Sequence, residues 1–118
     1  MEDYAAYKEN DILTRPPEQL VVLLYEGAIS SLKRAAAAME AGDHETKAHH
    51  CNRAQAIIDE LNVSLDTEAG GEVAANLRRL YLFMTTHLSQ ANVRQDPQMI
   101  RDVVACLEDL NEGWKAIS

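Results

Sequence analysis

The sequence predicts an all-α protein: an antiparallel up-down-up-down four-helix bundle preceded by an N-terminal arm. The helix-breaking residues are few and well spaced, and they divide the 118 residues into an arm and four segments of similar length. Each segment carries apolar residues three and four positions apart, which is the spacing of one helix face. Because the links are short, consecutive helices are expected to be antiparallel neighbours. We assign residues 1–16 to the arm and 17–118 to the bundle.

The first two helices are separated by Gly42. Pro17 suits the first turn of a helix because its missing N–H group would be unpaired there, and Gly42 suits a helix end. The first helix is therefore expected over about residues 17–42, and the second, capped by Asp43, over about residues 43–65. The core-facing residues are Val21, Tyr25, Ala28, Leu32, Ala35 and Met39 in the first helix and Cys51, Ala54, Ile58, Leu61 and Leu65 in the second.

The last two helices are delimited by a glycine pair and a proline. The segment from Asp66 to Gly71 indicates a turn, so the third helix is expected over about residues 72–91. Asp96 and Pro97 indicate the start of the fourth helix, which is expected to end between residues 114 and 117. The core-facing residues are Val73, Leu77, Leu80, Met84, Leu88 and Ala91 in the third helix and Ile100, Val103, Val104, Leu107, Leu110 and Trp114 in the fourth.

The charge balance is acidic, because 11 Lys and Arg residues against 19 Asp and Glu residues give a formal net charge of −8. Nucleic-acid binding and docking on anionic membranes both favour a basic face, so we expect neither. The sequence contains no run of about 18 apolar residues, so we expect no membrane-spanning helix. The N-terminus lacks the basic region and apolar stretch of a signal peptide. Cys51 and Cys106 lie on apolar sides of their helices, which indicates free thiols in a cytoplasmic protein.

Several helices carry more apolar residues than one buried face can hold. In the second helix, Ile57 lies roughly 80° and Val63 roughly 160° from the core-facing stripe. The residues similarly displaced in the first and third helices are Leu20, Leu23, Leu82 and Phe83. The arm is also apolar, at Tyr4, Tyr7, Ile12 and Leu13. A single exposed apolar residue is ordinary, but a set on three helices predicts a binding protein, with the arm as a displaceable lid.

No residue has the sequence surroundings of a catalytic or metal-binding group. His49, His50 and Cys51 are consecutive, so around a helix they point in three directions and form no metal site with Glu45. Gly70 and Gly71 form an isolated pair, which indicates a turn and not a phosphate-binding loop. No nucleophilic triad can be assembled from the sequence around the hydroxyl residues Ser64, Thr85 and Thr86. We therefore expect no enzyme activity, no metal and no cofactor.

Several sequence blocks, in collinear order, cover nearly the full chain. The most specific runs from Asn52 to Leu61 (Asn-Arg-Ala-Gln-Ala-Ile-Ile-Asp-Glu-Leu), and another from Leu23 to Ile29 (Leu-Leu-Tyr-Glu-Gly-Ala-Ile). Further matching positions are Tyr7, Thr14, Pro17, Glu18, Leu20, Ser64 to Asp66, Gly70 to Ala74, Asn76, Leu77, Leu80, Tyr81, Ala91, Asn92 and Trp114. Together these blocks resemble the FliS family of flagellar secretion chaperones, which accompany flagellin before export. Glu26 stands where the family usually has aspartate, and Pro16 where a small residue is common.

The resemblance implies a chaperone for the C-terminal segment of flagellin, which is disordered in the monomer and helical in the filament. Apolar grooves between helices would cover this segment, prevent premature polymerisation and release it at the flagellar export gate. The implied polar edge of the groove consists of Asn52, Arg53 and Gln55. The implied apolar lining consists of Ile57, Ile58, Leu61, Val63 and Leu65, with Leu77 and Tyr81 as a facing wall. Leu20 and Leu23 are added as partner-binding candidates because they lie outside the core-facing stripe of the first helix. The implied lid or docking arm contains Tyr7, Ile12 and Leu13.

Two other functions stay open at the level of the sequence. Four-helix bundles can carry a phosphorylated histidine, so His49, His50 and His87 are candidates for a phosphotransfer site. An adaptor for another secreted client would have the same spare apolar surface. Only the family resemblance favours flagellin over such a client.

Overall fold

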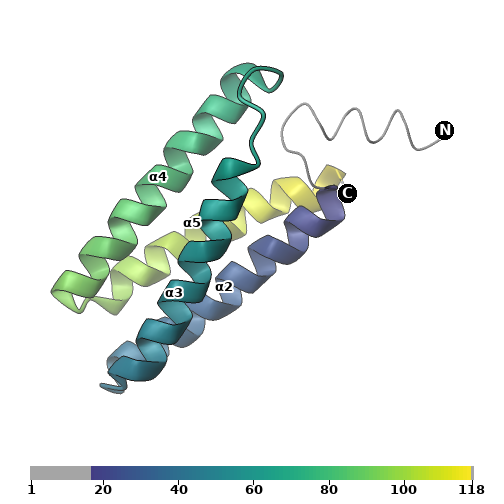
Figure 1. Cartoon of the computed structure of the whole chain (residues 1–118). Helices are drawn as coiled ribbons and strands as arrows, with labels where there is room; N and C mark the ends of the chain where they lie inside the picture. The colour runs from purple at the N-terminus through teal and green to yellow at the C-terminus, as the bar shows by residue number, and fades with distance from the viewer. Residues whose placement is uncertain (1–16, 118) are drawn as a thin grey trace.

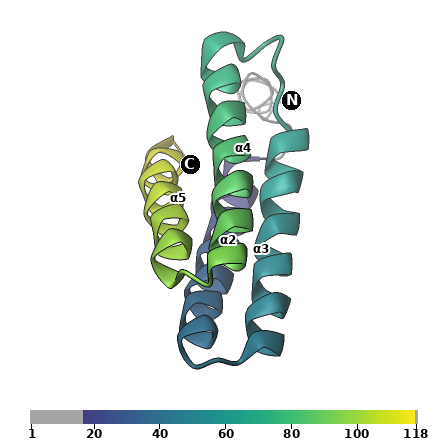
Figure 2. The same ribbon diagram turned by 90° about the vertical axis from the view of Figure 1, so that its left-hand side faces the viewer.

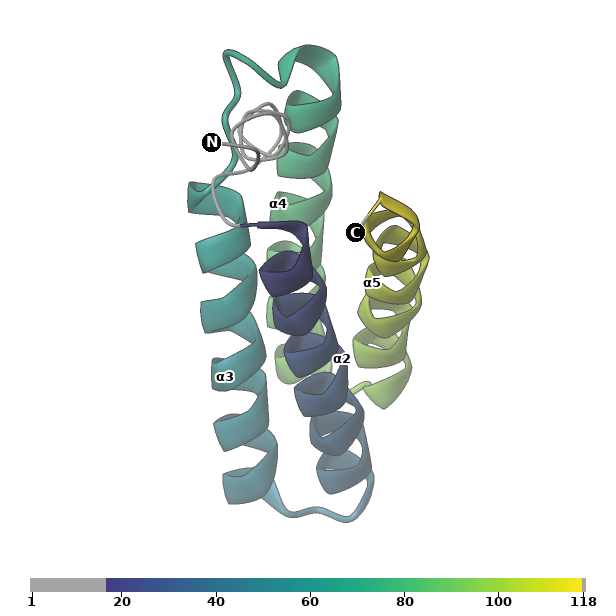
Figure 3. The same ribbon diagram turned by 90° about the vertical axis from the view of Figure 1, so that its right-hand side faces the viewer.

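The computed structural model describes residues 17–117, which form four helices (Figure 1). They are α2 (Glu18–Glu40), α3 (His44–Val63), α4 (Gly71–Arg94) and α5 (Pro97–Ile117). Helix α2 lies between α3 and α5 (Figure 3), and α4 completes the bundle beside α3 (Figure 2). Consecutive helices run in opposite directions (Figure 1). The predicted all-α four-helix bundle is confirmed.

The helix ends are fixed by glycine and aspartate residues at the predicted positions. Gly42 has φ of +74°, a conformation that favours glycine, and the next N–H group, of Asp43, donates to the carbonyl oxygen of Ala38 at 2.9 Å. The carboxylate of Asp43 then caps α3 by accepting hydrogen bonds from the N–H and the hydroxyl of Thr46 at 3.1 and 2.7 Å. At the start of α5, the carboxylate of Asp96 accepts from the N–H of Gln98 at 3.0 Å.

Each helix buries one apolar stripe, and the stripes of α2 and α3 are those that the spacing predicts. In α4 the prediction was wrong at one position, because Val73 is 55 % exposed while Ala74 beside it is fully buried. Ala74 lies three residues before Leu77 and therefore continues the buried stripe, whereas Val73 is rotated by about 100°. The buried stripe of α4 also includes Tyr81.

Neither cysteine is disulfide-bonded, as predicted, and burial raises the pKa of both the Cys51 and the Cys106 thiol. No helix between residues 17 and 117 is long and apolar enough to cross a membrane.

Candidate functional site

Large apolar side chains remain exposed on every helix. The most exposed on α2 and α3 are Leu23 (62 %) and Val63 (82 %), and Leu20 is 46 % exposed. The exposed apolar residues of α4 and α5 are Val73, Leu82, Phe83, Val93 and Ile117. The sequence prediction that Leu20, Leu23, Val63, Leu82 and Phe83 lie outside the core is confirmed. Exposed apolar residues indicate a binding partner only where they form a contiguous patch.

Helices α2 and α3 come close together beside two of these leucines. A Cβ atom added at Gly27 would lie 3.4 Å from Cδ1 of Ile57, so the Ile57 side chain sits directly over Gly27. Leu20, Leu23 and Gly27 are three or four residues apart and share one face of α2. Ile57 is only half-buried although it packs against the core. The result is an apolar surface that α2 and α3 build together.

The same surface becomes basic toward the α2–α3 turn. Arg34 follows Gly27 by seven residues, and His50 and Arg53 precede Ile57 by seven and four, so each lies on the face of its own helix already described. Arg34 of α2 lies close enough to His50 of α3 for its charge to act on the imidazole. Burial lowers the pKa of His50, and the positive charges of His49, Arg34 and Arg53 lower it further. We call Leu20, Leu23, Gly27, Arg34, His50, Arg53 and Ile57 the α2–α3 surface.

A second groove, between α3 and α4, is polar. Gln55 donates hydrogen bonds to the hydroxyl of Thr85 and to the carboxylate of Asp59, both at 2.8 Å. Lys47 donates to the side-chain oxygen of Asn92 at 3.0 Å. The cavity between these helices measures about 300 Å³, and its lining residues are Cys51, Asn52, Gln55, Asp59, Thr85, Leu88, Ser89 and Asn92. Two of these hydrogen bonds, from Gln55 to Thr85 and from Lys47 to Asn92, therefore join α3 to α4 at this groove.

The structure divides the residues predicted for one groove among four places. Arg53 and Ile57 lie on the α2–α3 surface, whereas Asn52 and Gln55 line the α3–α4 groove. Val63 projects from the end of α3 and is largely exposed. The predicted groove residues that are buried in the core are Ile58, Leu61, Leu65, Leu77 and Tyr81. The three predicted arm residues, Tyr7, Ile12 and Leu13, lie outside the described residues.

Three residues of the α2–α3 surface were not predicted as partner-binding residues from the sequence: Gly27, Arg34 and His50. Their spacing carries a signal, because positions 20, 27 and 34 of α2 and positions 50 and 57 of α3 are seven apart. A seven-residue interval returns to nearly the same helix face. The interval alone does not show which two helices bring these faces together.

The full chain, residues 1–118, matches the family model described as "Flagellar protein FliS". The chain belongs to the FliS family. A flagellar secretion chaperone FliS of Salmonella typhimurium is 42 % identical over 111 residues, which are 93 % of this chain and 82 % of that protein. Its namesake in Bacillus subtilis is 35 % identical over 95 % of this chain and 83 % of its own length. A third, from Campylobacter jejuni, is 35 % identical over 97 % and 89 % respectively.

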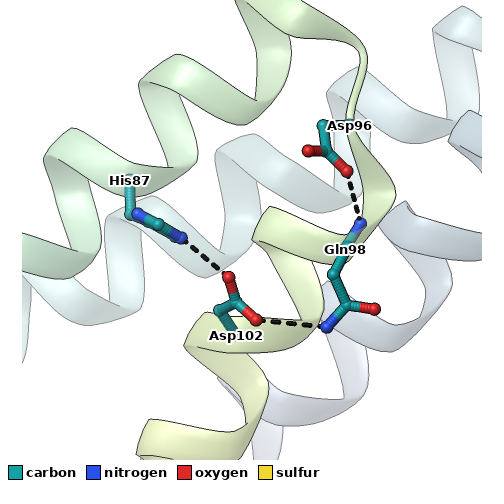
Figure 4. Close-up of polar contacts among 4 residues, drawn as sticks. All are labelled: His87, Asp96, Gln98 and Asp102. Atoms are coloured by element: carbon teal, nitrogen blue, oxygen red, sulfur yellow. Dashed lines mark hydrogen bonds and ion pairs between the residues drawn. The ribbon is translucent and has the colours of Figure 1, made fainter.

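Membership of the FliS family makes this chain a member of a chaperone family. Of the three histidines that the sequence offers for phosphotransfer, His87 makes side-chain contacts within the bundle. Nε2 of His87 lies 3.1 Å from a carboxylate oxygen of Asp102, whose other oxygen accepts from Gln98 (Figure 4). Hydrogen bonds from His87 and Gln98 lower the pKa of Asp102. The Phe83 ring stacks on His87 with its centroid 4.9 Å away. Within residues 17–117, no three His, Cys, Asp or Glu side chains are grouped as metal ligands.

Proposed function

We propose that this chain binds the C-terminal segment of flagellin in the cytoplasm, prevents its premature polymerisation and delivers it to the flagellar type III export apparatus. The observation that supports this function best is the α2–α3 surface, where exposed Leu20 and Leu23 adjoin the contact between Gly27 and Ile57. An amphipathic helix can lay its apolar face along such a surface. Membership of a family of flagellar secretion chaperones supports a flagellar client.

Binding of this kind requires no chemical step. A client segment that is disordered when free loses conformational entropy as it becomes helical on the chaperone, which lowers the affinity per unit of buried area. The complex therefore stays reversible while the apolar face of the client is covered. Handover at the export gate then requires only a competing surface.

We also propose that the arm, residues 1–16, competes with the client for the bundle. The proposal rests on the apolar residues Tyr7, Ile12 and Leu13 and on the spare apolar surface of α2 and α3. Deleting residues 1–15 is expected to tighten client binding, because the client no longer displaces the arm. Unchanged or weaker binding would contradict competition by the arm.

Calorimetric titration of the full chain with a peptide covering the C-terminal helices of flagellin from the same bacterium tests the client. The informative variant is Leu23→Asp, with Leu82→Asp as its matched control. The two leucines are 62 % and 52 % exposed and lie on α2 and α4, so neither substitution removes a core side chain. Leu61 is unsuitable for this test because it is 2 % exposed, and a carboxylate there would be buried without a partner.

We expect the unmodified chain to bind the peptide one-to-one. Leu23→Asp is expected to raise the dissociation constant by roughly tenfold or more, as for a hot-spot residue of an interface. Leu82→Asp is expected to change the dissociation constant by less than about threefold. Circular dichroism checks that both variants stay helical. Absence of binding by the unmodified chain at high micromolar concentration overturns the flagellin assignment. Equal losses in the two variants overturn the assignment to the α2–α3 surface.

A further inference from the structure

The α2–α3 surface changes its chemical character along its length. Leu20 and Leu23 lie near the start of α2, while Arg34 lies near its end, toward the turn that leads into α3. Because a helix rises 1.5 Å per residue, Arg34 is about 16 Å from Leu23 along α2. On α3, Arg53 and His50 follow the same direction from Ile57. One end of the surface is thus apolar and the other basic.

The two arginines of this surface have no acidic partner within residues 17–117, although the chain carries a formal net charge of −8. Lys33, Arg101 and Lys115, by contrast, each pair with a glutamate. Arg34 also borders the cavity between α2 and α5. Three glutamates line that cavity: Glu26 and Glu108 are paired with Lys115 and Lys33, and Glu112 forms no ion pair with Arg34.

Leaving cations together without a counter-ion is unfavourable, because like charges on neighbouring positions repel one another. The pKa of His50 is lowered first by burial and then by the positive charges of His49, Arg34 and Arg53, which disfavour a charged imidazole between them. A bound carboxylate would relieve this repulsion, and the guanidinium group suits it because it can donate two parallel hydrogen bonds. The net charge of the whole chain disfavours the other anionic occupants, a nucleic acid or a lipid surface.

We propose that the partner segment on the α2–α3 surface carries acidic side chains at one end, and that these side chains pair with Arg34 and Arg53 while its apolar residues cover Leu20, Leu23 and Ile57. This inference rests on the proposed function and specifies the chemistry of the client at the same surface. The acidic residues lie about 16 Å, or three helical turns, from the apolar ones. Charge pairing at one end fixes the direction in which the segment lies along α2 and α3 and speeds its association.

The test is charge reversal at Arg34 and Arg53 together, R34E/R53E, with R78E/R94E as the matched control. Arg78 and Arg94 are exposed on α4, and both double variants change the net charge equally. The probes are the flagellin C-terminal peptide and a copy with its acidic residues replaced by lysine. Dissociation constants are measured by calorimetry at low and at high salt, with circular dichroism as the check on folding.

We expect R34E/R53E to weaken binding of the natural peptide by roughly tenfold at low salt, and by less at high salt because exposed charges are screened. The lysine-containing peptide is expected to bind R34E/R53E more tightly than it binds the unmodified chain, a rescue that misfolding cannot produce. The control variant is expected to behave like the unmodified chain within about threefold.

The outcomes separate the two proposals. Binding by the unmodified chain that R34E/R53E and R78E/R94E reduce equally overturns the acidic-end inference and leaves the proposed function standing. Loss of binding in R34E/R53E without rescue by the lysine-containing peptide also overturns direct pairing. Failure of the unmodified chain to bind the natural peptide overturns the proposed function and the inference that rests on it.

Discussion

The hydroxyl groups of Tyr25 and Tyr81 meet inside the bundle at an oxygen–oxygen distance of 2.6 Å. The two residues belong to α2 and α4, so their hydrogen bond connects two helices that are not consecutive in the chain. Burial raises the pKa of both tyrosines, which therefore stay uncharged. Trp114 of α5 packs on Tyr25 with a ring-centroid distance of 6.3 Å, so aromatic side chains of three helices meet in the core.

Replacing one tyrosine, Tyr81→Phe, is expected to lower the free energy of unfolding by about 1–3 kcal/mol, because the hydroxyl of Tyr25 is then buried without that partner. The double variant Y25F/Y81F is expected to lose less than the sum of the two single losses, since neither hydroxyl remains unpaired. Urea denaturation of the three variants measures these values. Single losses that add to within about 0.3 kcal/mol would show that the hydrogen bond carries no coupling.

At the scale of elements, three ion pairs connect α2 and α5. They join Glu26 to Lys115, Lys33 to Glu108 and Glu40 to Arg101 at 3.6, 3.3 and 2.6 Å. Successive pairs are seven residues apart on both helices, and the signs alternate along each helix. A slip of one helix by seven residues would place Glu26 against Glu108 and Lys33 against Arg101. The charge pattern therefore disfavours a register shifted by seven residues in this antiparallel pair.

The coupling between Lys33 and Glu108 is a prediction at this scale. Both side chains are at least half exposed, so we expect a favourable coupling of only about 0.2–1 kcal/mol. It is obtained from a double-mutant cycle with K33E, E108K and K33E/E108K, in which the exchanged pair regains much of the stability that the single reversals lose. The coupling is expected to shrink in 1 M salt. A salt-independent coupling would instead indicate packing of the side-chain stems.

The elements themselves were predictable from the sequence because their causes are local. Gly42, Asp43 and Asp96 act on backbone groups within a few residues, and the apolar stripes repeat within each helix. The candidate site was predictable only in part. Residues two positions apart on α3 diverge by about 200°, so Arg53 lies toward α2 and Gln55 toward α4. That division depends on which helix lies on each side of α3, which the pattern of one helix does not contain.

At the scale of the whole molecule, the bundle combines a filled core with an apolar and basic surface on one pair of helices. Tyr25, Tyr81 and Trp114 form part of the core, whereas Leu23 and Arg34 lie outside it. Substitutions of the exposed residues of the α2–α3 surface, such as Leu23 and Arg34, are therefore expected to change binding with little effect on folding. Because core and binding surface consist of different residues, a change in the stability of the bundle when peptide is added can be used to measure client binding.

A bound client is expected to raise the melting temperature of the chain by mass action, because it binds the folded bundle and not the unfolded chain. At a free peptide concentration of 100 times the dissociation constant, the stabilisation is about 2.7 kcal/mol, which corresponds to roughly 10 °C for a domain of this size. Thermal unfolding followed by circular dichroism, with flagellin C-terminal peptide present and absent, measures the shift.

Matched variants connect this shift to the α2–α3 surface. At equal peptide concentration, Leu23→Asp is expected to show a much smaller shift than Leu82→Asp, since only Leu23 belongs to that surface. Without peptide, the two variants are expected to melt within a few degrees of the unmodified chain, because both side chains are exposed. Peptide binding detected by calorimetry without any rise in melting temperature would contradict docking on the folded bundle, because it would require the unfolded chain to bind the peptide equally well.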